Sequence, residues 1–130
     1  MTENELKDFL LDFTRDPMVL SHVEHAVGHF VYKVYAKKDK SKTASLEIMY
    51  REDGYIVINS PLGELPREAQ KLERLLEFNL EPVYSKIASH EGELYEIFIS
   101  HLEQLTQAEL INALWEVAVL AAVFQERINH

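Results

Sequence analysis

The sequence predicts an α+β domain in which three helices pack on an antiparallel sheet of five strands. Two groups of residues alternate apolar and polar side chains, the pattern typical of strands. An amphipathic helix at about 66–79 separates the groups, and a long apolar helix, Gln107–Ile128, follows them. The elements therefore read α-β-β-β-α-β-β-α. The five strands are expected at 27–36, 44–51, 55–59, 83–89 and 94–100.

The first element is an amphipathic helix at about 3–15, because apolar side chains recur there at helical spacing. Asp16 and Pro17 then break this helix or begin a second short one, since proline suits the first helical position after an Asp cap. Residues 18–26 show no decisive period. The apolar positions of the helix are Leu6, Phe9, Leu10 and Phe13.

The first group of strands begins at Val27, where the period becomes two. Both faces of 27–36 carry bulky side chains, which predicts partial cover on both sides. The next strand alternates cleanly through Ala44, Leu46 and Ile48, and a hairpin turn follows at Glu52-Asp53-Gly54. We expect Pro61-Leu62-Gly63 to end the third strand.

The two later helices have start signals of their own. Pro66 lies near the start of the 66–79 helix, where a missing N–H is tolerated. The final helix begins after Thr106, which forms a capping box with Glu109, and Leu105 and Leu110 fit the accompanying hydrophobic staple. The strands between these helices are joined by His90-Glu91-Gly92-Glu93.

Composition narrows the class of protein. The chain has 130 residues and a mass of 15.1 kDa, which suits one domain spanning residues 1–130. With 22 acidic and 13 basic residues its formal charge is −9, which opposes binding to nucleic acid. There is no cysteine, and Met1–Glu5 does not resemble a signal peptide. The longest apolar stretch, Val117–Phe124, is too short to span a bilayer, so we expect a cytoplasmic protein.

Three segments carry a family resemblance: Leu62–Pro66, Leu75–Leu80, and a strand pair followed by a helix with Leu102, Leu105 and Leu110. Their order resembles the secretion-chaperone superfamily, meaning the acidic bacterial Tir chaperones (type III secretion chaperones) and the YbjN-like sensory transduction regulators. The resemblance implies an α+β homodimer without enzymatic activity. One branch binds extended segments of other proteins, and the other is mostly of undefined function. The implied dimer contact comprises Leu72, Leu75, Leu76, Leu80, Val83 and Ile87.

The final helix carries two apolar stripes, whereas a helix on a monomer surface needs one. Glu116 is its only charged residue between Glu109 and Glu126. The first stripe suits the sheet. The second can face the first helix, a partner subunit or a client protein, and its candidate contacts are Trp115, Ala118 and Ala122.

Other polar clusters are weaker candidates for a site. If 22–29 were helical, His22, His25 and His29 would share a face and could bind zinc, copper or nickel; locally bonded or solvated histidines are the simpler interpretation. Lysines 37, 38, 40 and 42 could dock an anion, or form a solvated loop that blocks sheet pairing. The acid pairs lie in predicted turns, where a catalytic pair would lack burial.

The sequence therefore predicts a non-enzymatic, protein-binding module without a cofactor, which forms a homodimer and captures an extended segment of a client. An apolar groove between helix and sheet, or strand addition at a sheet edge, would hold the segment. The alternative function is that of a YbjN-like regulator or adaptor with a folded partner. A more remote alternative is a metal protein that uses the histidines.

Overall fold

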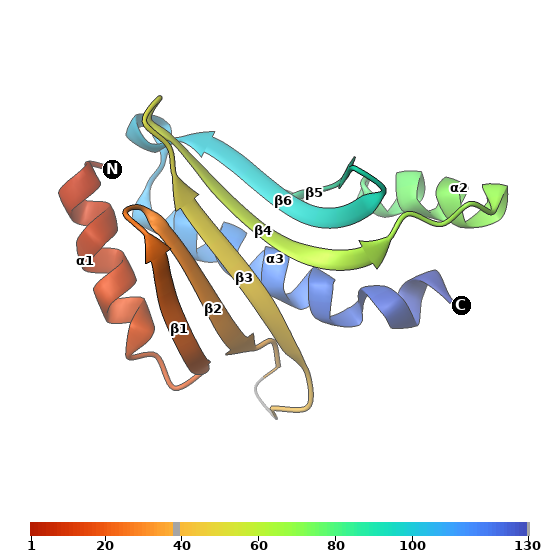
Figure 1. The fold of residues 1–130 in the computed structure, drawn as a ribbon, viewed down its shortest axis with the longest axis horizontal. Coiled ribbons are helices and arrows are strands. Elements are labelled where there is room, and N and C mark those ends of the chain that lie inside the picture. The colour runs from red at the N-terminus through yellow and green to blue at the C-terminus, as the bar shows by residue number, and fades with distance from the viewer. Residues whose placement is uncertain (38–39, 130) are drawn as a thin grey trace.

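A computed structural model describes residues 1–37 and 40–129. Its sheet has six antiparallel strands in the order β1-β2-β3-β4-β6-β5 (Figure 1). The fold class is as predicted, with one strand more than expected. The elements are α1 (Glu3–Thr14), β1 (Val19–Ala26), β2 (His29–Tyr35), β3 (Thr43–Tyr50), β4 (Tyr55–Glu64), α2 (Ala69–Phe78), β5 (Lys86–His90), β6 (Glu93–His101), the short 3-10 helix η1 (Leu102–Gln104) and α3 (Gln107–Ile128).

The additional strand is β1, in the segment whose sequence shows no decisive period. It pairs with β2 along its length, but its register is interrupted near each end, between Val19 and Ser21 and between Glu24 and Ala26. Every residue of β1 after Val19 is exposed. Bulges and exposure together remove the apolar alternation by which a strand is recognised. The prediction of five strands was wrong for this reason.

Several element boundaries also differ from the prediction. β4 does not end at Pro61 but continues to Glu64, through a bulge between Pro61 and Gly63, whose φ of 113° suits glycine. α2 begins at Ala69 instead of 66, and β5 begins at Lys86 instead of 83. The predicted boundaries of α3 are confirmed, including the capping box of Thr106 and Glu109.

Two helices cover the same face of the sheet. The apolar rung Phe30–Ile48–Ile58–Phe98, of which Phe30 is only partly buried, crosses four strands on this inner face. In Figure 1, α3 lies behind the strands. α1 lies alongside β1 and buries Leu6, Phe9, Leu10 and Phe13 in the same core. A smaller core joins α2 to the end of α3 through Leu62, Leu75, Leu94, Phe124 and Ile128.

By length and composition alone α3 could cross a membrane, since an 18-residue window of it has a mean hydropathy of 1.4. The prediction considered only the uninterrupted apolar stretch Val117–Phe124, and so underestimated the apolar length of this helix. In the structure α3 packs on the sheet and buries Leu110, Leu114, Val117 and Phe124, among others. Core helices of globular domains have the same composition.

Candidate functional site

An open groove lies between α1 and the inner face of β1 and β2, and is here called the α1 groove. Its volume is about 810 Å³. Most of the lining surface is apolar, because β1 carries no large buried side chain that would fill the space under α1. The residues that line it are Glu3, Leu6, Lys7, Leu10, Leu11, Thr14, His22, Glu24, Val27, Gly28, Phe30, Tyr32, Tyr50, Arg51 and Glu52.

Tyr32 lies at the base of the α1 groove. Its side chain is 1% exposed, packs against Phe13 at 5.0 Å between ring centroids, and stacks with His22 at 6.1 Å. Its hydroxyl is buried and has no hydrogen-bond partner among the described residues. Burial, and then the negative charge of Glu24, raise the pKa of Tyr32 to about 12. An unpaired hydroxyl is costly, and a bound polar group could pair with it.

The outer edge of β1 borders this groove, with α1 alongside it in Figure 1, and its backbone groups are unpaired among the described residues. Within residues 1–37 and 40–129, no backbone or side-chain group hydrogen-bonds the edge of Leu20–Ala26 that faces away from β2. Apolar side chains are exposed along this segment and its turn, at Leu20, Val23 and Val27. An exposed apolar edge strand is a template for pairing with another chain.

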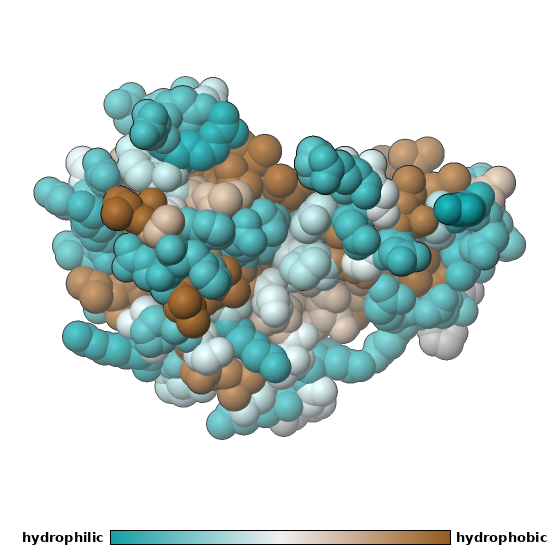
Figure 2. All heavy atoms as spheres, viewed as in Figure 1, coloured by the Kyte–Doolittle hydropathy of each residue, from teal (hydrophilic) through white to brown (hydrophobic). Residues whose placement is uncertain are grey.

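A second apolar surface lies at the opposite end of the molecule, over α2 and the loop that precedes β5. Its centre is formed by Leu76, Leu80 and Val83, which are 72%, 86% and 80% exposed. Leu72 and Ile87 are partly buried beside them. We call these five residues the α2–β5 patch, and Figure 2 shows apolar side chains among polar ones at this end. A hollow of about 250 Å³ lies between α2 and β5.

All six residues of the resemblance-implied dimer contact lie in or under this patch. Leu75 differs from the others because it is buried in the smaller core and supports α2 from beneath. The remaining five form the patch itself. That a second subunit covers these five side chains stays a prediction.

Glu116 fixes the loop that carries Val83. Its carboxylate oxygens accept hydrogen bonds from the backbone N–H groups of Val83, Tyr84 and Ser85, at 2.7, 2.8 and 2.9 Å. Charge-assisted hydrogen bonds of this kind are among the strong ones in proteins. They hold this part of the loop against α3, which explains why β5 begins only at Lys86.

Asn79 closes the outer edge of β5. Its side-chain oxygen accepts from the N–H of Ile87 at 2.6 Å, and its amide donates to the carbonyl of Ile87 at 3.2 Å. The side chain therefore makes the two hydrogen bonds that a neighbouring strand would make. With Ser85 N–H already bound to Glu116, this edge offers too short a run for strand addition.

The client contacts predicted on α3 are largely internal. Ala118 is completely buried, so it cannot touch a client in this arrangement. Trp115 is half-buried, with its ring 5.9 Å from that of Phe13 on α1. Ala122 is also partly buried against the main core. Of the first helix, a partner subunit and a client protein, the structure thus shows the first helix, α1, packed on the second apolar stripe of α3.

The histidines are not arranged as the metal hypothesis requires. Residues 22 and 25 lie on β1 and residue 29 on β2, so the helix that would align them is absent. His22 stacks with Tyr32, whereas His25 contacts His29, whose Nε2 lies 3.5 Å from Glu47. Within the described residues, no three His, Asp or Glu side chains gather as a metal site would require.

The lysines of the loop after β2 have partners of their own. Lys42 forms an ion pair with Glu126 on α3, and Lys40 lies over the ring of Tyr35. Lys37 is exposed, and Lys38 lies outside the described residues. Two of the described lysines thus contact other side chains of the protein, which weakens the case for a cluster that docks an anion.

Sequence reasoning missed Glu96, a buried acid on β6. Its side chain is 2% exposed, and its Oε2 has no hydrogen-bond partner among the described residues. Burial raises the pKa of this carboxyl, the Ser85 hydroxyl opposes that shift, and the charge of Glu116 adds to it. The sequence could have indicated this position, because side chains two residues apart in a strand share a face. Glu96 therefore lies on the inner face with Leu94 and Phe98.

Comparison with known proteins identifies the class of fold. The structure is similar to that of the Yersinia pestis type III secretion chaperone SycH, with a TM-score of 0.52 and 15% sequence identity. The match covers 94% of this chain and 96% of SycH. The protein therefore has the fold of the secretion chaperones, and the predicted resemblance is confirmed at the level of fold.

That SycH structure is of a complex with a stable fragment of YscM2. No family model matches the sequence, and no curated protein matches it either.

Proposed function

We propose that this protein is a non-enzymatic, chaperone-like module that binds an extended segment of a client protein. The observation that carries the proposal is the open edge of β1 beside the α1 groove. A segment added to that edge would satisfy free backbone groups, while alternate side chains enter the groove. The complex of SycH with a fragment of YscM2 supports a binding role of this kind. The acidic composition suits a cytoplasmic protein.

We further propose that the protein is a homodimer through the α2–β5 patch. Large apolar surfaces are uncommon on monomers unless they bind something. The hydrogen bonds of Asn79 and Glu116 hold the patch in place before association. Little conformational entropy would therefore be lost when a dimer forms. The α1 groove lies at the other end of the molecule, and a dimer through α2 would leave it open to a client.

A pair of variants tests the binding proposal. Leu11, 58% exposed, lines the α1 groove, whereas Ile99, 51% exposed, lies on the uncovered outer face of the sheet. A client recovered from lysate with the wild-type protein should be lost with Leu11→Asp and retained with Ile99→Asp. Amide exchange of Leu20–Ala26 should slow when that client is added. Equal capture by both variants, with unchanged exchange in β1, would refute the proposal.

An adaptor that binds a folded partner is the second candidate, because the outer face of the sheet has no helix over it among the described elements. The rung His29–Met49–Val57–Ile99 crosses this face and is largely apolar. In that case Ile99→Asp, and not Leu11→Asp, would abolish capture. The same pair of variants therefore separates the two functions.

A further inference from the structure

The charges around the α1 groove indicate which segments it prefers. Three carboxylates, those of Glu3, Glu24 and Glu52, line the groove, and none of them forms an ion pair with another described residue. Arg51 is compensated, because its guanidinium lies 2.6 Å from Asp53. Lys7 is then the remaining cation of the lining. The opening is electronegative in a molecule whose formal charge is already −9.

The aromatic side chains of the lining can also receive the cation of a basic flank. Phe30, Tyr32 and Tyr50 supply aromatic side chains, whose faces attract ammonium and guanidinium groups. The Tyr32 hydroxyl is buried and has no hydrogen-bond partner among the described residues, and burial, then the charge of Glu24, raise the pKa of Tyr32 to about 12. An N–H donor from a ligand could supply the hydrogen bond that the tyrosine oxygen lacks, close to Glu24.

From these features we infer that the α1 groove selects basic segments, in which an apolar centre that fills the groove is flanked by lysine or arginine. The inference rests on the proposed binding function and adds the chemistry of the client. Apolar contact with Leu6, Leu10 and Leu11 would supply the affinity that every apolar segment shares. The acidic lining would supply the discrimination, because it attracts basic flanks and repels acidic ones.

Three fluorescent peptides provide the test. Each has eight residues, the length of β1, and the same apolar centre, with lysines, glutamines or glutamates at both ends. Fluorescence anisotropy measures their dissociation constants. The lysine peptide should bind about fivefold more tightly than the glutamine peptide, and the glutamate peptide more weakly than both.

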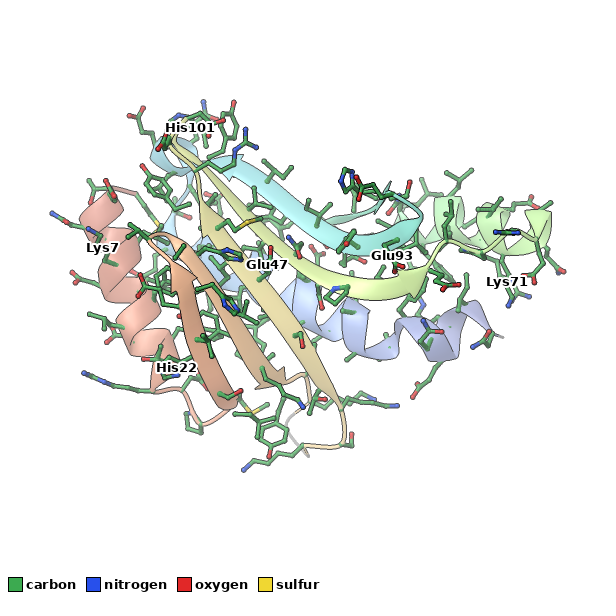
Figure 3. All side chains as sticks on the ribbon, in the orientation of Figure 1. Lys7, His22, Glu47, Lys71, Glu93 and His101 are labelled. Carbon is green, nitrogen blue, oxygen red and sulfur yellow. The ribbon has the colours of Figure 1, made fainter. Side chains whose placement is uncertain are left out.

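Two double variants of equal net charge separate a local effect from the overall acidity of the protein. Glu24→Gln with Glu52→Gln removes charges at the groove. Glu91→Gln with Glu93→Gln removes two exposed charges where β5 turns into β6, one in the turn and one at the first residue of β6. Figure 3 shows Glu93 well apart from Lys7 and His22, on the side of the molecule towards α2. The preference for lysine should disappear in the first variant and persist in the second.

The outcomes distinguish this inference from the function on which it rests. If both double variants lose the preference equally, or the three peptides bind alike, the inference is wrong. Peptide binding that Leu11→Asp abolishes would still support the proposed function in that case. If no peptide binds to the wild-type protein, both the inference and the proposed function are wrong for segments of this kind.

Discussion

A carboxyl group without full pairing inside a protein destabilises the fold when it is ionised, and Glu96 is in that position. Its folded-state pKa is raised above the ordinary 4.5, chiefly by burial. Ser85, Glu116, Lys86 and Arg127 are the polar and charged groups that act on it. The folded state therefore holds this proton more tightly than the unfolded chain does. The wild-type protein should gain stability from this group as pH falls from neutral towards 4.5.

We predict that Glu96→Gln has a free energy of unfolding about 1 kcal/mol larger than that of the wild type in mildly alkaline buffer. Its urea midpoint should therefore be higher. The difference should shrink as pH approaches the ordinary value of 4.5. Glu93→Gln, an exposed position on the same strand, is the control and should change little. A Glu96→Gln protein that is less stable than the wild type at every pH would contradict the burial argument.

Trp115 is the only tryptophan, and it joins α3 to α1 through Phe13. Replacing it with alanine would leave a gap between these helices, and we expect Trp115→Ala to cost about 3 kcal/mol of unfolding free energy. Urea titration followed by circular dichroism measures this cost. Trp115→Phe should retain most of the stability. A loss below about 1 kcal/mol for the alanine variant would show that the contact with α1 contributes little.

The importance of single residues was only partly visible in the sequence. Glu116 is evident as the lone charge within a long apolar segment, but the groups it binds lie 31–33 residues upstream in the chain. No local pattern connects the two. The inward position of Glu96 follows from strand period, whereas its burial depends on how closely α3 approaches the sheet.

At the level of elements, the loop before β5 should depend on α3. Removal of the Glu116 carboxylate would leave three backbone N–H groups, of Val83, Tyr84 and Ser85, without their acceptor. We predict that Glu116→Ala costs about 2 kcal/mol and accelerates amide hydrogen exchange at these three residues. Glu116→Gln, which keeps one carbonyl acceptor, should be intermediate. Unchanged exchange at these residues in Glu116→Ala would show that the loop is held by other contacts.

The elements that sequence predicted well are those with strong local signals. Both ends of α3 were correct, because a capping box and a continuous apolar pattern define it. β1 was missed because its side chains are exposed and its ends are bulged. The α1 groove is lined in part by β1, so it could not be anticipated from the sequence. The α2–β5 patch was anticipated through the family resemblance and not through period or composition.

For the whole molecule, we expect a mass of twice 15.1 kDa by light scattering at micromolar concentration. Leu76→Asp should return the protein to a single chain, because it places a charge in the centre of the α2–β5 patch. Since the contact is apolar, added salt should change the mass little. Leu11→Asp, in the α1 groove, should remain dimeric. A single-chain mass for the wild type, unaffected by Leu76→Asp, would exclude the dimer.

The two edges of the sheet are chemically different, and the side chain of Asn79 causes much of that difference. Sheets that are open on both sides can join end to end without limit, which is the geometry of fibrils. Here the Asn79 amide occupies one side at Ile87, so a chain that docks on β1 of another copy presents no second acceptor edge for a third. Repeated pairing of β1 on the β5 edge of the next copy, a contact that could continue without limit, is therefore disfavoured. One asparagine thus caps one edge of a sheet whose other edge strand, β1, has no hydrogen-bond partner on its outer side among the described residues.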